Sequence, residues 1–269
     1  MNRNDRNMII VIAIAAVIII GGWLVISNSS GVKPPFTVIE SHSMQHCQAD
    51  DRHSEVGVID TGDMILVRSL DKTDVTTYVE GSQNGYQMFG DYGDVIIYKR
   101  TGNNPVIHRA FIWLEYNGSS WSAPSLAGYT GDWYNEGNTD YNHMSGTLTF
   151  YNVGVVVPGG KVLSIDLDSL GTRSGYLTVG DSVSNIYFDQ STSICPSGPV
   201  TPDMIKSVAW KEIPWLGAIK LILKGNSSEL NTWAPNSKTM LVCEFATIFL
   251  VVIGLNYLIT EILIQRRKE

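Results

Sequence analysis

The sequence has little charge and little cysteine for its length. Charged side chains make up 17% of its 269 residues, and only three residues are cysteine. Hydrophobic residues make up 44%, which is too apolar a composition for an intrinsically disordered chain. The length suits one medium-sized domain with membrane segments added to it.

Basic side chains are scarce in the central part of the chain. The whole sequence has 19 Lys and Arg against 26 Asp and Glu. Without the five basic and four acidic residues of segments 1–27 and 240–269, 14 basic residues face 22 acidic ones. A nucleic-acid partner is therefore excluded, because phosphate binding needs a basic surface.

A recognisable metal-binding pattern is also missing. The nearest group of ligand-type side chains is His42, His46, Cys47 and His53. Its spacing matches no common zinc pattern, and adjacent ligands are geometrically awkward, so solvated histidines beside a loop are the better explanation. We predict neither a metal nor another cofactor. Cys47 and Cys195 lie in the same central segment and could form a disulfide, which their spacing neither favours nor excludes.

A long apolar run lies near the start of the chain. Residues 8–26 include no charged or strongly polar side chain and would span about 28 Å as a helix, close to the thickness of a bilayer core. A cleaved signal peptide is the alternative, but its apolar core is shorter, roughly 7–15 residues, and ends at a small-x-small site. We therefore predict an uncleaved membrane anchor within residues 1–27.

A second apolar run, residues 240–264, is interrupted by Glu244, Asn256 and Thr260. A charged side chain near a helix end can reach the membrane interface, so the run still predicts a second membrane span within 240–269. A helix that lies on the membrane surface is the alternative.

Basic residues flank both runs on the side of the chain ends: Arg3, Arg6, Arg266, Arg267 and Lys268. Cytoplasmic flanks of membrane helices are enriched in Lys and Arg. This pattern predicts two spans of the cell membrane with both termini in the cytoplasm, and residues 28–239 on the extracytoplasmic side.

The central segment is typical of β structure. Turn residues such as Gly62-Asp63 and Gly93-Asp94 precede short β-branched runs, and no segment of useful length has helical periodicity. We expect a mainly β sandwich or barrel, since the strands are too closely spaced for βαβ units. The runs are 64–67, 94–98, 106–113, 146–151, 153–157, 162–165 and 176–179.

Residues 115–172 are predicted to be an inserted loop or small cap, because much of this stretch is rich in Gly, Asn, Ser and aromatic residues without periodicity. Four aromatic side chains in it could form a recognition surface or pack the insertion onto the sheet: Tyr129, Trp133, Tyr134 and Tyr141.

Ser43 lies about fifteen residues beyond the first apolar run. A serine hydroxyl is a weak nucleophile until a base takes its proton. His42 is adjacent, but neighbouring side chains of an extended chain point to opposite faces. His108 closes a β-like run, where a rigid strand could hold its imidazole beside the serine. Ser41 lies on the same face as Ser43, and its hydroxyl could help the Ser43 N–H group to hold an oxyanion.

Six short motifs follow one another in the order found in type I signal peptidases, and the chain resembles this family in them. The resemblance covers most of the central segment except the insertion. It implies a signal-peptidase-like β-rich domain and a membrane-bound serine endopeptidase, a hydrolase that removes signal peptides from exported preproteins. The motifs are Ser41-His42-Ser43-Met44, Ile59-Asp60-Thr61-Gly62-Asp63-Met64-Ile65-Leu66-Val67, Tyr92-Gly93-Asp94-Val95-Ile96-Ile97-Tyr98, Pro105-Val106-Ile107-His108-Arg109, Tyr176-Leu177-Thr178-Val179-Gly180-Asp181 and Ile213-Pro214-Trp215-Leu216-Gly217.

Histidine in the fourth motif is similar to the archaeal and endoplasmic-reticulum branch of the family, whereas the bacterial enzymes use a lysine base. The resemblance implies Ser43 as nucleophile and His108 as general base. Lys99 is the local alternative, but a lysine at a strand end should stay hydrated and protonated.

The acidic member of the site stays open. The family has Gly-Asp-Asn-Asn followed a few residues later by aspartate, whereas this chain has Gly180-Asp181-Ser182-Val183 and then Asp189. By resemblance, Asp189 would orient His108 and Asp181 would support the site. Asp132, with Asp140 further on, is a lower-ranked alternative.

The resemblance implies two partners: signal peptides, with small side chains at the first and third positions before the cut, and the lipid bilayer. Met44 is a candidate for contact with the substrate or the membrane, unless it packs in the core. The alternative function is a catalytically inactive, signal-peptidase-like β module, tethered to the membrane for binding or assembly. It fits the altered acidic motif and the aromatic insertion.

Overall fold

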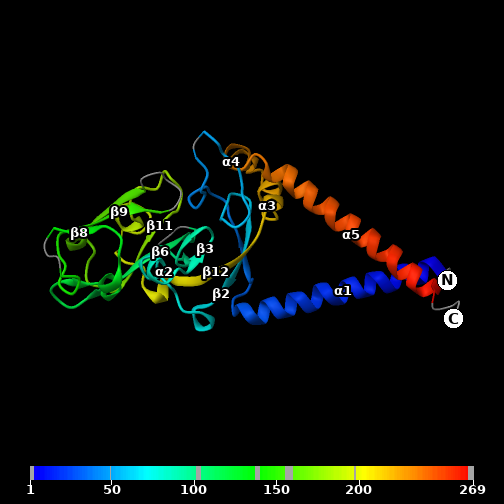
Figure 1. Cartoon of the computed structure of the whole chain (residues 1–269), viewed down its shortest axis with the longest axis horizontal. Helices are drawn as coiled ribbons and strands as arrows, with labels where there is room; N and C mark the ends of the chain where they lie inside the picture. The colour runs from blue at the N-terminus through cyan, green and yellow to red at the C-terminus, as the bar shows by residue number, and fades with distance from the viewer. Residues whose placement is uncertain are drawn as a thin grey trace.

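The computed structural model describes residues 3–48, 50–100, 104–136, 140–154, 160–196 and 198–265. It shows a β-rich domain between two long terminal helices, α1 (Arg3–Ser30) and α5 (Ser237–Gln265), as Figure 1 shows. Both helices contain a stretch long and apolar enough to cross a bilayer, with mean hydropathy 3.1 and 2.1. The predicted β-rich domain with an apolar helix at each end is confirmed. The basic flank at 266–268 lies outside the described residues.

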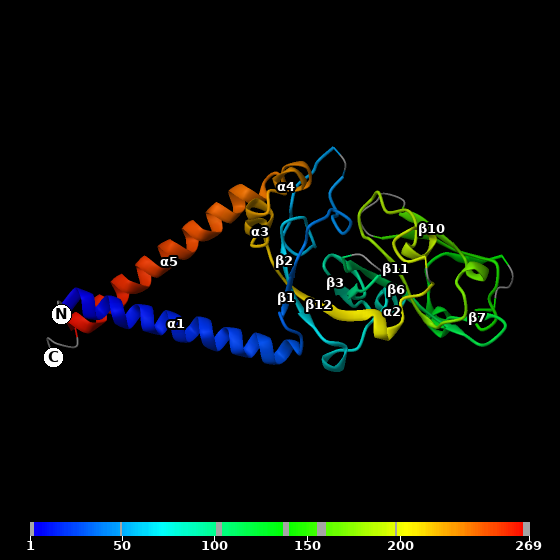
Figure 2. The same ribbon diagram turned by 180° about the vertical axis from the view of Figure 1, so that it is seen from behind.

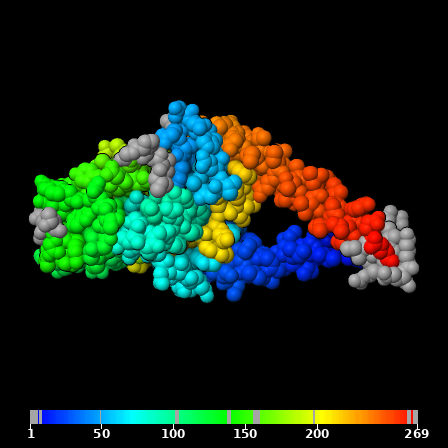
Figure 3. All heavy atoms as spheres, viewed as in Figure 1, coloured from blue at the N-terminus to red at the C-terminus, as the bar shows by residue number. Residues whose placement is uncertain are grey.

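The two long helices leave the domain on the same side and converge at their far ends, where the chain begins and ends (Figures 1 and 2). Close to the domain they are separated, and an open space remains between them in the space-filling view (Figure 3). This arrangement fits a two-span membrane protein.

The main sheet is antiparallel and has the strand order β1-β2-β12-β5-β6-β11, with β7 paired to β6. The longest strand, β6, runs through the middle of the domain and pairs with both β5 and β11. The strands are β1 (Phe36–Val38), β2 (Met64–Arg68), β5 (Val95–Tyr98), β6 (Val106–Tyr116), β7 (Trp121–Ser122), β11 (Gly175–Val179) and β12 (Ile205–Ile213).

The insertion forms a second sheet, β8 (Trp133–Asn135), β9 (Thr147–Val153) and β10 (Lys161–Asp166), in the order β10-β9-β8. It packs on the main sheet through Phe150, whose ring lies edge-on against Phe111 at 4.8 Å. Most of the predicted run 153–157 lies outside the described residues. Of the four aromatic side chains, Tyr134 is exposed, and the other three pack against the core: Tyr129, Trp133 and Tyr141.

Several short elements complete the domain, and the sequence pattern did not indicate them because each is too short for a recognisable period. One of them, α2, begins with a capping box between Thr77 and Glu80 and ends at Gly85, whose φ of 79° is left-handed. The helices are α2 (Tyr78–Asn84), α3 (Ala218–Leu223) and α4 (Ser227–Trp233). The hairpin is β3 (Gln87–Met88) with β4 (Asp91–Tyr92), and the 3-10 turns are Leu70–Lys72, Pro124–Gly128, Leu167–Ser169, Asp189–Ser191 and Pro202–Met204.

Two of the motifs, far apart in the sequence, pack against each other where the sheet meets α3. Asp63 accepts hydrogen bonds from the backbone N–H groups of Trp215 (2.8 Å) and Asp60 (2.7 Å). A Cβ at Gly217 would lie 2.4 Å from the Asp63 carbonyl oxygen, so only glycine fits there. This junction connects the β domain to the helices that lead into α5.

Three carboxyl groups in this region have raised pKa values. Burial is the main cause, and it raises the pKa of Asp60 to about 6, of Glu212 to about 7 and of Asp63 to about 8. The folded protein therefore holds these protons more tightly than the unfolded chain. Their contribution to the unfolding free energy is fully present below about pH 4. It is lost as the pH rises through the pKa values of these groups in the folded protein.

Glu212→Gln should flatten this pH dependence. The Gly57 N–H group donates to Glu212 Oε2 at 2.7 Å, and Oε1 is buried without a hydrogen-bond partner in the part of the chain that the structure describes. An amide can therefore keep the hydrogen bond to Gly57 without titrating. We expect the loss of unfolding free energy between about pH 5 and pH 8 to shrink by on the order of 1 kcal/mol, because solvent screens this half-buried group. Urea unfolding at several pH values measures it.

The control for this prediction is the exposed Glu115→Gln, which should leave the pH dependence unchanged. Equal slopes in the wild type and Glu212→Gln would show that Glu212 ionises normally in the folded protein.

Candidate active site

A groove of about 750 Å³ opens beside β1, immediately after the end of α1. Val32 and Pro34, which follow α1, are among the residues that line it. Ser43 and His108 both line the groove, although 65 positions separate them in the sequence. The fold therefore brings the candidate nucleophile and the candidate base to one surface, next to the first candidate membrane helix.

Ser43 lies in a turn that follows β1, and Met44 anchors this turn. The Met44 side chain is fully buried with Ile39, Ile59 and Ile65 in a hydrophobic cluster. The predicted contact of Met44 with the membrane or a substrate is therefore wrong, and the alternative, core packing, is correct. Met44 thus points into the core, whereas the neighbouring Ser43 lines the groove.

The hydroxyl of Ser43 lies 3.4 Å from that of Ser41, so the two serines face the same way. This is the one hydrogen bond of the Ser43 hydroxyl to the described residues, and His108 does not share it. Catalytic hydrogen bonds are often long or absent before a substrate is bound. His42 stacks on Trp233 and makes no hydrogen bond to Ser43, although residues 41–44 form a turn and not the extended chain on which the prediction was based.

His108 is buried and is held by Asp189. Its Nδ1 lies 2.8 Å and 2.7 Å from the two carboxylate oxygens of Asp189, which is itself buried. The Nδ1–H group therefore donates to the carboxylate, which leaves Nε2 as an acceptor. A Cβ at Gly180 would lie 3.0 Å from His108 Nε2 and 2.4 Å from the Ser43 carbonyl oxygen. Glycine at position 180 thus permits the close approach of the histidine to the serine loop.

Two further hydroxyl groups hold Asp189, and the sequence analysis missed both. Tyr98 donates to Asp189 Oδ2 at 2.7 Å, and Thr178 donates to the same oxygen at 2.6 Å. Tyr98 lies on β5, next to the strand that carries His108. Side chains on alternate positions of paired strands share one face. This alternation was the signal in the sequence, since both residues lie inside the motifs already identified.

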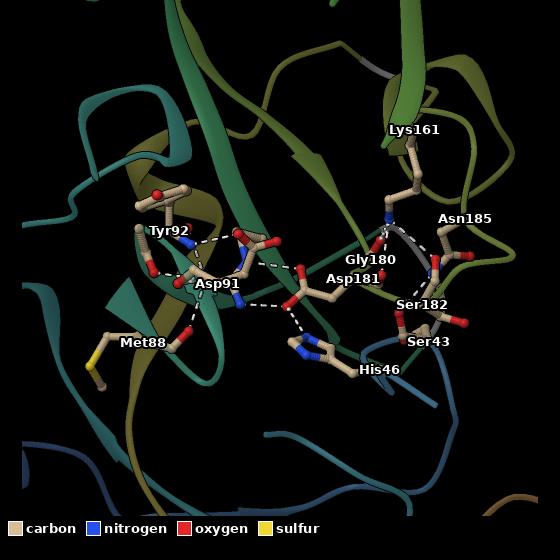
Figure 4. A network of polar contacts seen from close by, with 12 residues as sticks. Ser43, His46, Met88, Asp91, Tyr92, Lys161, Gly180, Asp181, Ser182 and Asn185 are labelled. Carbon is tan, nitrogen blue, oxygen red and sulfur yellow. Dashed lines mark hydrogen bonds and ion pairs between the residues drawn. The ribbon is translucent and has the colours of Figure 1, made fainter. Parts of the chain in front are cut away.

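Asp181 does not contact His108 and pairs with Arg109. Burial alone would raise the pKa of Asp181, but the Arg109 guanidinium holds it well below its usual value. Arg109 Nε donates to Asp181 Oδ1 at 2.8 Å, and a second nitrogen donates to Oδ2. His46 Nε2 also contacts Asp181 Oδ2 at 3.3 Å (Figure 4). His46 is therefore not one of the solvated histidines expected beside this loop, since its side chain is 10% exposed.

Lys161 connects the insertion to this region. Its buried ammonium donates to three backbone carbonyls at 3.0–3.2 Å: Gly180, Asp181 and Ser182 (Figure 4). Burial lowers the pKa of Lys161. Lys161, Leu163 and Ile165 occupy the inward-facing positions of β10. The signal in the sequence was a lysine at a position that alternates with the apolar, inward-facing residues of the strand.

The turn at residues 180–182, which Lys161 holds, also fixes the backbone at Ser43. The N–H group of Ser182 donates to the Ser43 carbonyl oxygen at 3.0 Å, and Asn185 Nδ2 donates to the same oxygen at 2.7 Å. The Ser43 peptide is thereby tied to the segment that follows β11.

The structure keeps the rival residues away from His108. Lys99 is exposed at the end of β5. Asp132 accepts a hydrogen bond from Asn152, and Asp140 contacts His143, in both cases within the insertion. Cys47 and Cys195 do not form a disulfide with each other. Among the described residues, no group of three or more His, Cys, Asp or Glu is placed to hold a metal ion.

No protein-family model, no curated protein and no solved structure matches the chain. The chemistry of the groove is therefore judged from its own geometry: a serine, a histidine with a defined tautomer and a carboxylate that orients the histidine.

Lys161→Met should loosen the turn at 180–182. The variant keeps the aliphatic stem but removes the Lys161 hydrogen bonds to the carbonyls of Gly180, Asp181 and Ser182, of which the last keeps a bond from the Asn185 N–H group. We therefore expect a loss of about 1–3 kcal/mol of unfolding free energy. Hydrogen exchange at the Ser182 amide should become faster, because this amide bonds Ser43. The exposed Lys211→Met is the matched control. Unchanged exchange at Ser182 would show that Lys161 does not hold the turn.

Proposed function

We propose that the protein is a membrane-bound serine endopeptidase that removes N-terminal signal peptides from exported preproteins, with a serine nucleophile and a histidine base. The observation that carries the proposal is the buried His108–Asp189 pair beside the Ser43 loop. An imidazole oriented by a carboxylate through Nδ1, with Nε2 facing a serine, is the arrangement that activates a hydroxyl for acyl transfer. The order of the six motifs, which resembles that of type I signal peptidases, supports the same function.

In the proposed mechanism, Ser43 Oγ attacks the scissile carbonyl while His108 Nε2 takes its proton. His108 then gives this proton to the leaving amine, and water hydrolyses the acyl-enzyme by the same route. Asp189 keeps Nδ1 protonated and stabilises the imidazolium that forms. The N–H group of Ser43, with the Ser41 hydroxyl, would hold the oxyanion.

The position of the groove suits a substrate that the membrane delivers. The groove begins within two residues of Ser30, where α1 ends, so a signal peptide in the same bilayer would reach it at a raised effective concentration. The strand β1 lies at the edge of the sheet and lines the groove. An extended substrate could pair with its free edge and place alternate side chains toward the enzyme.

The proposed topology has the β domain on the extracytoplasmic side of the cell membrane and both termini in the cytoplasm. The convergence of the free ends of α1 and α5 supports a common side for the termini, and the basic residues near the chain ends support the cytoplasm.

The alternative is an inactive, tethered module with the same fold. It is favoured by one observation, the hydrogen bond of the Ser43 hydroxyl to Ser41 instead of His108.

Purified protein in detergent, incubated with a model preprotein that has small residues before the cut, separates the two functions. We expect cleavage by the wild type, and a loss of about 10³-fold or more in Ser43→Ala and in His108→Ala. Lys99→Ala is the control and should retain activity. Cleavage by Ser43→Ala would show that Ser43 is not the nucleophile. A wild type that is folded but inactive would favour the tethered module.

Substitutions of Asp189 and Asp181 should have different effects on activity and stability. Asp189→Asn removes the group that sets the tautomer of His108, so kcat should fall by about 10⁴-fold in a protein that stays folded. Asp181→Asn leaves the buried Arg109 without its counter-charge and should cost about 3–5 kcal/mol of unfolding free energy. Preprotein cleavage and urea unfolding measure both. The reverse pattern would make Asp181 the orienting residue.

A further inference from the structure

The loop that carries Ser43 is held from a second direction, by the end of α4. The His42 ring stacks on the Trp233 ring with their centroids 3.6 Å apart and their planes within 10°. The guanidinium of Arg52 lies 4.0 Å from the centroid of the same ring. His42 Nδ1 is buried and has no hydrogen-bond partner among the described residues. The stack is therefore the contact that orients this side chain.

The backbone of Trp233 contacts the same loop on the other side of Ser43. Gln45 Nε2 donates to the Trp233 carbonyl oxygen at 2.7 Å, and Gln45 Oε1 accepts from the Thr61 hydroxyl at 3.1 Å. Gln45 is buried, so these bonds are shielded from water. Trp233 thus holds the residue before Ser43 through its ring and a residue shortly after Ser43 through its carbonyl.

A third contact ties the same loop to the start of α5. The side-chain amide of Asn236 accepts from the Ser54 N–H group and donates to the Ser54 carbonyl, both at 2.8 Å. Asn236 immediately precedes α5, which begins at Ser237. The segment 233–236 therefore joins the second candidate membrane helix directly to the loop between β1 and β2.

We propose that Trp233 is a positioning residue for the nucleophile, and that the second membrane helix thereby forms part of the structure that holds Ser43. The inference rests on the proposed function. Trp233 acts through His42 and Gln45 and contacts no reacting atom. The described residues between β1 and β2 form no strand or helix, so tertiary contacts hold this loop in place. A displacement of about 1 Å in a reacting group can reduce the rate about 10²-fold.

The assignment gives α5 a role beyond tethering. Because Trp233 and Asn236 lie within four residues of the start of α5, a change in how this helix enters the bilayer reaches the loop between β1 and β2 through these two residues. The turn at 180–182 holds the Ser43 carbonyl from the other side, so the nucleophile lies between the insertion and the second membrane helix.

The test is Trp233→Ala in the full-length protein, in detergent and with the model preprotein as substrate. We expect kcat to fall about 10²-fold while KM changes less than about threefold, because Trp233 is not among the residues that line the groove. Trp233→Phe keeps a ring that His42 can stack on and should recover most of the activity. Amide hydrogen exchange of residues 41–45 should become faster in Trp233→Ala.

The matched control is Trp210→Ala. Trp210 lies on β12 and also stacks against an arginine, with the Arg68 guanidinium 3.6 Å from its ring. It does not contact the Ser43 loop, so kcat should stay near the wild-type value. An equal fall of kcat in both alanine variants, or wild-type kcat and exchange in Trp233→Ala, would overturn the assignment.

A wild type that does not cleave would count against the proposed function, but not against the inference that Trp233 holds the Ser43 loop. In that case the exchange rates alone decide, since faster exchange of residues 41–45 in Trp233→Ala, but not in Trp210→Ala, still shows that Trp233 holds the loop.

Discussion

The buried guanidinium of Arg109 is the interaction on which the rest of the site depends. It is 1% exposed and contacts Asp181, and one of its nitrogens lies 2.7–3.3 Å from the carbonyl oxygens of Met88, Asp91, Tyr92 and Gly93. A buried charge is tolerated only when a counter-charge and hydrogen bonds replace its hydration. Arg109 therefore forces the β3–β4 hairpin and the segment after β11 to close around one point. His108 precedes it on β6 and faces the opposite side of the strand.

Ser43 is held in place by two parts of the chain that are distant from it in the sequence. The insertion supplies Lys161, which holds the turn that bonds the Ser43 carbonyl, and the end of α4 supplies Trp233, which holds the residues on either side of Ser43. Met44 pulls the loop into the core between these two supports. The groove is thus built by packing from several directions.

Much of the fold was predictable because it depends on local pattern. Two apolar runs predicted the terminal helices, and short β-branched runs predicted most strands of the main sheet. The short helices α3 and α4 were missed, since six or seven residues do not show a period. The insertion, expected to be a loop or small cap, forms a three-stranded sheet. The predicted runs 146–151 and 162–165 correspond to β9 and β10, whereas β8 was not predicted because three residues are too few for a recognisable pattern.

Within the site, the sequence by itself determined the residue types, their order and their alternation along strands: a serine beyond an apolar run, a histidine beside an arginine on one strand, and two aspartates after another. The tertiary structure alone decided the partners. Asp189 reaches His108 and Asp181 reaches Arg109, because those contacts depend on how β6 and β11 pair and on the path of the chain after them. Lys161 and Trp233 were not indicated, because hydrogen bonds and ring contacts between segments distant in the chain leave no local pattern.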